Sequence, residues 1–188
     1  AVATALNLLA EAARPVIMVG TGAYRSRAED ELLAFVEATG IPVYSDFEAH
    51  GLLPASHPLH GGTFHKMADL PTGDDGIDVV LALGVRFGLF TLGGSGRLVP
   101  AGARLIHVEA DAREIGRLRD AEIPILADPR ETLKALLLHA HERRWPDRRS
   151  WQGVVVAAKS ARRLRLGPAL ERQDGPIHPL QAVNAIVE

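Results

Sequence analysis

Residues that could bind a phosphorylated small molecule follow closely after apolar runs of this chain. Gly20 and Gly22 follow the apolar residues 16–19, Arg86 follows residues 79–83, and Glu109 follows residues 105–108. A guanidinium group matches the geometry of a pyrophosphate, and a carboxylate can accept hydrogen bonds from ribose hydroxyls. In open α/β sheets, ligands bind where the strands end. These spacings predict a nucleotide site, with Gly94 in a glycine-rich loop as a further candidate for close approach to the ligand.

Each of these residues also has a purely structural interpretation. The segment around Gly20 and Gly22 has two of the three small residues of the dinucleotide fingerprint, because Arg25 takes the third place. The two glycines could serve a tight turn whose backbone dihedrals need no Cβ, or the loop could present amides to a phosphate. Arg86 could pair with a carboxylate at a domain contact, and the glycines around Gly94 could simply form a loop.

Other chemistries are poorly represented in the sequence. Residues 73–76 (Gly-Asp-Asp-Gly) superficially match the start of a magnesium–diphosphate motif, but residues 100–106 contain no asparagine to complete it, so we interpret them as a turn. Four histidines in residues 50–65 lack the spacing of a zinc site, and the chain has no cysteine. Ser95 lacks the spacing of a nucleophile elbow. No pair of carboxylates suggests an acid–base couple.

Composition limits the class of protein and its partners. The chain has 188 residues, of which 47% are hydrophobic and 23% charged, as expected of a globular domain with one good core. A net charge of −2 gives no basis for nucleic-acid binding. No apolar run approaches the roughly 20 residues of a membrane span. We expect a cytoplasmic protein with neither nucleic acid nor membrane as a partner, and both ends look internal to a longer chain.

The order of apolar runs and helical patterns predicts the fold class. It is α/β, a three-layer Rossmann-like domain of the DHS-like NAD/FAD-binding type, with a five- or six-stranded parallel sheet and helices on both faces. Strands are expected at residues 16–19, 41–44, 78–84, 105–108 and 123–127. Helices are expected up to residue 13 and at residues 26–39, 64–70, 111–119, 145–165 and from Asp128 onward, with residues 45–63 mainly a long loop. Asp111 and Glu114 have the spacing of a capping box.

Several segments together resemble the central domain of thiamine-diphosphate-dependent enzymes of the acetolactate synthase and benzaldehyde lyase type. Residues 14–20 (RPVIMVG) look like the first central-domain strand of that family. The segments that look most like benzaldehyde lyase are 83–88 (LGVRFG), 94–96 (GSG), 98–100 (LVP), 114–118 (EIGRL) and 145–148 (WPDR). The resemblance covers about residues 8–151 and the short segment 177–180.

The resemblance implies a place for the chain within a larger enzyme. Residues 1–141 would be the central domain, 142–176 an outer helix and a linker from 166 to 175, and 177–188 the truncated start of the diphosphate-binding domain. The parent would depend on thiamine diphosphate and Mg²⁺, bound outside this chain, and would form or cleave carbon–carbon bonds next to a carbonyl. Its partners would be the two other α/β domains, in a homo-oligomer (dimer or tetramer). No catalytic residue is expected here, and the isolated fragment is expected to be inactive.

The resemblance also bears on the nucleotide. Arg86, Phe87 and Glu109 match positions that touch FAD in acetolactate synthases. This chain has Gly88-Leu89-Phe90 where those synthases typically have Asp-Asp-Arg, a departure that argues against FAD and favours the benzaldehyde lyase-like branch. FAD, ADP and no nucleotide therefore remain alternatives for the site. A stand-alone Rossmann-like module for FAD, ADP or NAD, and a pure oligomerisation domain, are the other functions that the sequence leaves open.

Overall fold

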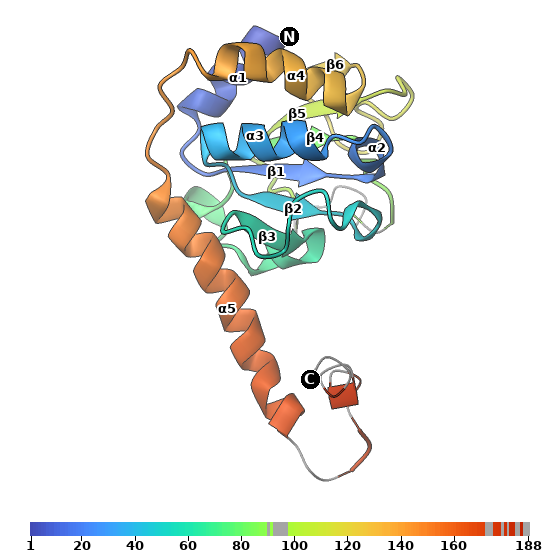
Figure 1. Cartoon of the computed structure of the whole chain (residues 1–188), viewed down its shortest axis with the longest axis vertical. Coiled ribbons are helices and arrows are strands. Elements are labelled where there is room, and N and C mark those ends of the chain that lie inside the picture. The colour runs from blue at the N-terminus through green and yellow to red at the C-terminus, as the bar shows by residue number, and fades with distance from the viewer. Residues whose placement is uncertain are drawn as a thin grey trace.

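The fold is a parallel α/β sheet with helical layers on both faces. We describe it from a computed structural model, which covers residues 1–89, 91, 98–171, 175–177, 179, 181–182 and 185. In this part of the chain, six strands form one parallel sheet in the order β3-β2-β1-β4-β5-β6 (Figure 1). The strands are β1 (Pro15–Val19), β2 (Val43–Ser45), β3 (His60–Thr63), β4 (Val79–Leu83), β5 (Arg104–Glu109) and β6 (Ile123–Leu126).

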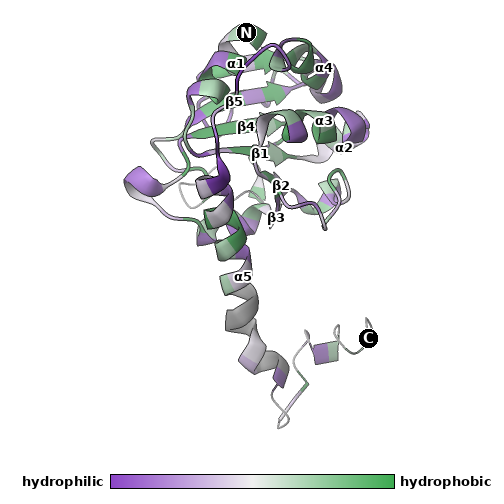
Figure 2. Cartoon of the chain, turned by 60° about the vertical axis from the view of Figure 1, so that its left-hand side comes forward, coloured by the Kyte–Doolittle hydropathy of each residue, from purple (hydrophilic) through white to green (hydrophobic). Residues whose placement is uncertain are grey.

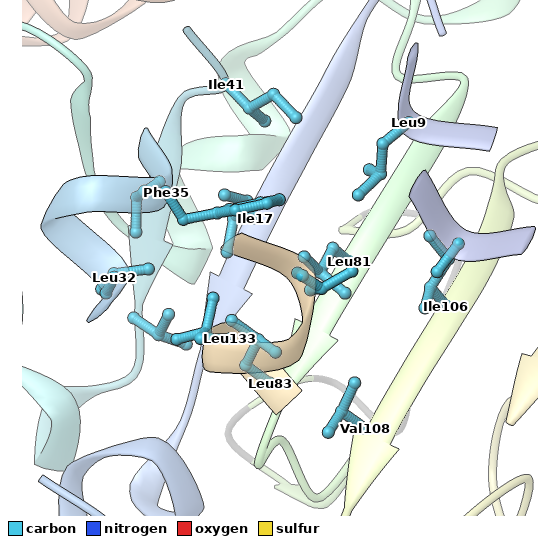
Figure 3. Packing of buried hydrophobic residues seen from close by; sticks show 14 of the residues in the cluster. Leu9, Ile17, Leu32, Phe35, Ile41, Leu81, Leu83, Ile106, Val108 and Leu133 are labelled. Atoms are coloured by element: carbon cyan, nitrogen blue, oxygen red, sulfur yellow. The ribbon is translucent and has the colours of Figure 1, made fainter. Parts of the chain in front are cut away.

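Different helices cover the two faces of the sheet. The helices are α1 (Val2–Glu11), α2 (Thr21–Arg25), α3 (Glu29–Thr39), α4 (Pro129–Ala140) and α5 (Arg149–Glu171), and the 3-10 helices are η1 (Phe47–Ala49), η2 (Phe64–Asp69) and η3 (Gly73–Asp75). Helices α1, α3 and α4 supply Leu9, Phe35 and Leu133 to one core against the sheet (Figure 3). On the other face, η2 and the first turns of α5 contribute to a second core, with Trp151 and Val155 from α5. The predicted three-layer fold is confirmed, with six strands.

The central strand β4 shows how the sequence dictates its own position. All five of its residues are buried, and it pairs with β1 on one side and β5 on the other. Leu81 and Leu83 enter the first core, whereas Val80 and Ala82 enter the second. A nearly continuous apolar run is what a parallel strand covered on both faces requires. The strands at the centre of the sheet are accordingly among the most hydrophobic parts of the chain (Figure 2).

Two helix ends follow the local signals in the sequence. Asp128 caps α4, because its side chain accepts hydrogen bonds from the backbone N–H groups of Arg130 and Glu131, and Pro129 occupies the first turn. Gly40 ends α3 in the left-handed conformation, with a φ of 68°. Both ends confirm the expectation from sequence.

The helix expected at residues 26–39 is present as α3, which begins three residues later, at Glu29, and ends at Thr39 as predicted. The structure adds a short helix that was not expected, α2, which begins at Thr21, where a turn was expected. Between them, Arg27 has a φ of 53°, a left-handed conformation that no α-helix interior accommodates. The short α2 therefore lies directly after β1, and α3 begins at Glu29.

The helix expected at residues 111–119 does not form. The segment is a series of turns and bends, and Gly116 has a φ of 72°. Asp111 does accept a backbone hydrogen bond from Arg113, but its carboxylate is also held by the Arg113 side chain, and Glu114 pairs with Arg117 instead of closing a capping box. None of its apolar residues, Ala112, Ile115 and Leu118, is buried, so no apolar contact fixes a helix against the sheet.

Strand β3 was missed because its residues, His60 to Thr63, were assigned to a loop. Glycines read as loop signals, yet here they allow an edge strand to lie against an aromatic ring. A Cβ on Gly61 would collide with the ring of Tyr44, which is buried on β2. The helix expected at residues 64–70 is present as the 3-10 helix η2.

The outer helix α5 is shifted towards the C-terminus relative to the prediction. It begins at Arg149, four residues after the predicted start at residue 145, and continues to Glu171, so the predicted linker at 166–175 is wrong over its first half. Its start is fixed by Arg148, whose buried guanidinium donates to the carbonyls of Leu9 and Ala12 near the end of α1 and of Thr39 at the end of α3. Those carbonyls have no partner within their own helices. The later turns of α5 project away from the sheet in Figures 1 and 2.

Candidate functional site

A pocket opens at the carboxyl edge of the sheet, where the strand order reverses. The chain adds β2 and β3 on one side of β1 and then returns to add β4, β5 and β6 on the other, so the loops after β1 and β4 diverge. A cavity of about 610 Å³ lies at this edge. Its lining comes from the segments after β1, β2, β4 and β5: Thr21, Gly22, Arg25, Asp46, Phe47, Glu48, Gly84, Arg86, Gly88, Leu89, Thr91 and Glu109.

The glycines after β1 allow that loop to lie against the end of β4. The N–H of Gly20 donates to the carbonyl of Leu83 (3.0 Å), and the N–H of Gly22 donates to the carbonyl of Gly84 (3.1 Å). A Cβ on Gly20 would collide with the Gly84 carbonyl, and a Cβ on Gly22 would lie 2.7 Å from the Gly84 Cα. Gly20 itself is extended, with a φ of −112°. The expected reason for these glycines, unusual dihedrals, is wrong, because close backbone contact requires them.

The amides of the same loop are used by the protein. Ala23 and Tyr24 both donate their N–H groups to the carbonyl of Gly20, at 3.0 and 3.2 Å, and Gly22 donates to Gly84 as described above. These three amides therefore close the turn into α2. They are not directed at a ligand in this conformation, contrary to one of the alternatives considered from sequence.

Arg86 and Glu109 are brought together in the pocket, as predicted. Arg86 is exposed on the loop after β4, and neither it nor Arg25 forms an ion pair within the described part of the chain. Glu109 ends β5 and is only 5% exposed. Its Oε1 accepts a hydrogen bond from the N–H of Ala110 (2.9 Å). One cavity is thus lined by a buried carboxylate and by two guanidinium groups that have no ion pair in the described ranges.

The charge of Arg86 also affects the pKa of Asp111, which is not among the residues that line the pocket. The pKa of Asp111 is lowered to about 2, first by hydrogen bonds from the side chain and backbone of Arg113 and to a smaller degree by the charge of Arg86. Asp111 is thus held by Arg113 (Nη2 to Oδ2, 2.7 Å), and the guanidinium of Arg86 is left available to the cavity.

The opposite wall of the pocket is acidic and aromatic. The hydroxyl of Thr21 donates to Oε2 of Glu48 (2.7 Å), which ties η1 to the loop after β1. Oδ1 of Asp46 accepts from the N–H of Phe47 and begins η1. The ring of Phe47 is 53% exposed and lies 5.5 Å from the ring of His65, centroid to centroid. This wall offers hydrogen-bond acceptors and a flat apolar surface.

Two of the predicted site residues, Gly20 and Phe87, do not line the pocket. Gly20 supports the loop from behind. Phe87 is 3% exposed and belongs to the second core, where its ring meets the ring of His107 edge to face. Gly94 lies outside the residues that the structure describes.

Sequence reasoning missed η1 as part of the site. Asp46, Phe47 and Glu48 come directly after β2, and the rule that singled out Arg86 and Glu109 applies equally to them. The predicted strand ended at residue 44, and what followed was assigned to a loop without function. The signal that would have found them is their position after a strand adjacent to β1 in the sheet.

The structure gives no metal centre among the residues it describes. The histidines and acidic residues of those ranges form no group of three or more that could hold a metal ion, and Asp74 and Asp75 lie in the 3-10 helix η3 before β4. Over the same ranges, every helix is too short or too polar to cross a membrane.

Comparisons with known proteins identify the family of this chain. Residues 2–136 match the family model "Thiamine pyrophosphate enzyme, central domain". The acetolactate synthase large subunit of Corynebacterium glutamicum is 38% identical over 135 residues, which cover 71% of this chain and 21% of that protein. A probable acetolactate synthase large subunit of Methanocaldococcus jannaschii is 32% identical over 186 residues, which cover 98% of this chain and 31% of that protein.

A third relative agrees with the first two. The acetolactate synthase large subunit IlvB1 of Mycobacterium tuberculosis is 31% identical over 193 residues, covering 98% of this chain and 30% of that protein. The chain therefore spans between a fifth and a third of the length of these relatives. The expected likeness to acetolactate synthase is confirmed, whereas the expected closer likeness to benzaldehyde lyase gains no support.

Proposed function

Because this chain belongs to the family of thiamine pyrophosphate enzyme central domains, we propose that it serves an acetolactate synthase-like enzyme that forms or cleaves carbon–carbon bonds next to a carbonyl. Thiamine diphosphate would supply the electron sink for that chemistry. The described residues contain no cluster of metal-ligating side chains that would hold its diphosphate through Mg²⁺. We therefore propose that this chain contributes a scaffold and a ligand pocket. We also propose that the whole protein has two other α/β domains, binds thiamine diphosphate and Mg²⁺ outside this chain, and assembles as a homo-oligomer.

We further propose that the pocket at the carboxyl edge binds a nucleotide. The observation that carries this is that two groups line one cavity at the switch point of the sheet: the 5% exposed carboxylate of Glu109 and the guanidinium of Arg86, which has no ion pair among the described residues. Arg86 and Arg25 supply positive charge for a diphosphate, which guanidinium groups bind through two parallel hydrogen bonds. Glu109 supplies an acceptor for ribose hydroxyls.

The carboxylates that line the pocket limit the kind of ligand it can bind. With Asp46, Glu48 and Glu109, carboxylates outnumber the two arginines in the lining, so a ligand that carries only negative charge would be repelled by most of it. A nucleotide has donors as well as an anion, because its ribose hydroxyls and exocyclic amine can face the carboxylates while its phosphates face the arginines. The exposed ring of Phe47 offers a surface on which a planar base can stack.

Between ADP and FAD, the lining favours ADP as the first ligand to test. Gly88 and Leu89 line the pocket where FAD-binding relatives were expected to carry charged residues, and Leu89 is 84% exposed. Gly88 and Leu89 therefore offer a flavin no polar side chain. ADP needs only the base, ribose and diphosphate contacts described above.

Thermal unfolding in the presence of candidate ligands tests the nucleotide proposal. A ligand at 100 times its dissociation constant stabilises the native state by about 2.7 kcal/mol, which raises the melting temperature visibly. We expect ADP to raise it, with smaller effects from NAD and coenzyme A. An unchanged melting temperature with ADP, FAD, NAD and coenzyme A would contradict a nucleotide site and leave a scaffold or oligomerisation domain.

The catalytic part of the proposal has a separate test. Incubated with thiamine diphosphate, Mg²⁺ and a 2-keto acid, the 188-residue chain alone is expected to show no carboligation above the protein-free background. Turnover by the chain alone would contradict the assignment of the catalytic groups to other domains. The nucleotide could also bind without changing the activity of an enzyme that contains this domain. That result would favour a nucleotide-binding module with an independent role over the scaffold proposed here.

A further inference from the structure

A buried histidine lies beneath the loop that carries Arg86. His107 is on β5, paired with Ala82 of β4, and is 0% exposed. Its neighbours on β5 are apolar, and an apolar side chain would fill the same space without burying polar nitrogen. The contacts of its two ring nitrogens show what the histidine adds.

The imidazole is directed at the residues on both sides of Arg86. Its Nε2–H donates to the carbonyl of Val85 (2.9 Å), and its ring meets the ring of Phe87 edge to face, with 5.2 Å between centroids. A carbonyl only accepts hydrogen bonds, so Nε2 must carry the proton. Nδ1 is buried and has no partner within the described residues. Every directed contact of the side chain is therefore with the loop of Arg86.

The backbone geometry explains why this carbonyl needs a side-chain donor. The hydrogen bonds between β4 and β5 continue to the N–H of Gly84, which donates to the carbonyl of Val108 (2.8 Å). At Gly84 the chain turns with a φ of 61° and leaves the sheet. The carbonyl of Gly84 accepts from the N–H of Gly22, but the carbonyl of the buried Val85 accepts from no backbone N–H within the described residues. A buried carbonyl without a donor destabilises the fold. His107 supplies the donor.

We propose that His107 is a positioning residue for the pocket, which holds Val85 and Phe87 so that Arg86 between them presents its guanidinium to the cavity. Arg86 is itself exposed and without an ion pair in the described ranges, so its place depends on the backbone that carries it. The effect on ligand affinity rests on the proposed nucleotide site. The fixing of the loop by the imidazole does not depend on any ligand.

The tautomer of His107 in the unmodified protein gives the first test. In a ¹⁵N-labelled sample, long-range ¹H–¹⁵N correlations distinguish a protonated Nε2 from a protonated Nδ1. We expect the neutral ring with the proton on Nε2. A proton on Nδ1 alone would place a lone pair against the Val85 carbonyl and would overturn the proposal without the need for any variant.

Three variants separate the hydrogen bond from general packing. His107→Phe keeps an aromatic ring against Phe87 but has no donor, whereas His107→Gln places an amide N–H near the position of Nε2. Leu105→Ala is the matched control, because Leu105 is 1% exposed on the same strand and faces the same core. The readouts are the backbone amide signals of residues 85–87 and the dissociation constant for ADP, both measured below the melting temperature of each variant.

We expect His107→Phe to shift or broaden the amide signals of residues 85–87 and to weaken ADP binding about tenfold, in line with the loss of one hydrogen bond to a buried group. His107→Gln and Leu105→Ala should stay within about threefold of the unmodified protein. Equal behaviour of the Phe variant and the unmodified protein would overturn the proposal, as would equal damage by Leu105→Ala. If the unmodified protein failed to bind ADP, the nucleotide site would fall, while the tautomer and the amide signals would still decide the role of His107.

Discussion

At the amino edge of the sheet, the side chains of Arg14, Asp78 and Arg104 form hydrogen bonds or ion pairs within the protein. At the carboxyl edge, two arginines face a cavity without ion pairs among the described residues. Asp78, before β4, accepts hydrogen bonds from the N–H groups of Ala13 and Arg14, and the Arg14 guanidinium donates to the carbonyl of Gly76. Arg104 forms an ion pair with Glu122.

Both edges are hollowed, so a cavity alone does not distinguish them. A hollow of about 570 Å³ lies at the amino edge. It is lined in part by Arg14, whose Nε donates to the carbonyl of Gly76, by Asp78, which accepts from backbone N–H groups, and by Asp74. The cavity of about 610 Å³ at the carboxyl edge contains Arg86 and Glu109, which have no such partner side chains in the described ranges. Cavity size therefore does not distinguish the two edges. The difference is that two arginines without an ion pair in the described ranges face the cavity at the carboxyl edge.

The largest expected effect concerns the glycine that joins β4 to the pocket. Gly84→Ala should lower the free energy of unfolding by about 3 kcal/mol, because a Cβ would lie 2.5 Å from the N of Ala23 and the φ of 61° strains any other residue. Urea unfolding measures it. The matched control at the amino edge is Gly73→Ala, with a φ of 68° and no atom within 4 Å of the added Cβ, for which about 1 kcal/mol is expected. Equal losses would mean that contact with α2 does not constrain Gly84.

A smaller loss of stability should follow from a change at the amino edge. Asp78→Ala removes the acceptor for the N–H groups of Ala13 and Arg14 and should lower the free energy of unfolding by about 2 kcal/mol. Its dissociation constant for ADP should be unchanged, because the two edges lie at opposite ends of β4. Asp75→Ala, in η3, is the control and should change stability by less than about 0.5 kcal/mol. A loss of ADP affinity in Asp78→Ala would contradict the division between the edges.

The arginines of the two edges should behave in opposite ways. Arg86→Ala should weaken ADP binding about tenfold, because a charge-assisted hydrogen bond to phosphate is lost, and should change stability by less than about 0.5 kcal/mol. Arg104→Ala should leave ADP binding unchanged and cost less than about 1 kcal/mol of stability, as exposed ion pairs do. Titration calorimetry and urea unfolding of both variants measure these effects. Tight ADP binding by Arg86→Ala would remove this residue from the site.

The smallest expected effect is the dependence of stability on pH. Burial lowers the pKa of His107 below 6.5, against weaker opposing effects of the hydrogen bond to Val85 and the charges of Glu109 and Glu114. Because the unfolded chain then binds the proton more readily, the contribution of neutral His107 is complete above pH 6.5 and is lost as the pH falls below it. Unfolding measured from pH 7.5 to 5 should show this decrease.

The control for this dependence is His107→Gln, because glutamine does not titrate in this pH range. In this variant the free energy of unfolding should depend less steeply on pH. A residual slope is expected from His60, whose pKa is lowered by burial first and then by the charges of Lys159, His50 and Lys66. If the unmodified protein became more stable between pH 6.5 and 5, the direction of both pKa shifts would be contradicted.

The sequence predicted those parts of the molecule that local pattern controls. The continuous apolar run of β4 and the capping pair Asp128 and Pro129 gave elements that the structure contains. Strand β3 could not be predicted in this way, because Gly61 is required by contact with the ring of Tyr44, which is distant in sequence. The same limit hid the roles of Gly20 and Gly22, whose partner is Gly84.

Within the site, the rule of strand ends found Arg86 and Glu109 but not what surrounds them. Phe87 is adjacent to Arg86 in sequence, yet the alternation of the backbone turns it into the core beside His107. Glu48 enters the pocket because Thr21 holds it, a contact that no spacing reveals. The residues that touch the cavity depend on the sheet order, and that order is a property of the fold.

The most direct test of the nucleotide site at the carboxyl edge is to map the amide signals of the ¹⁵N-labelled chain during titration with ADP. We predict saturable shifts for the described pocket residues after β1, β2, β4 and β5, including Gly22, Glu48, Arg86 and Glu109, with no change around Asp78 and Arg104 at the amino edge. Signals that stay unchanged, or that shift around Asp78 and Arg104 instead, would contradict the assignment of the nucleotide site to this pocket.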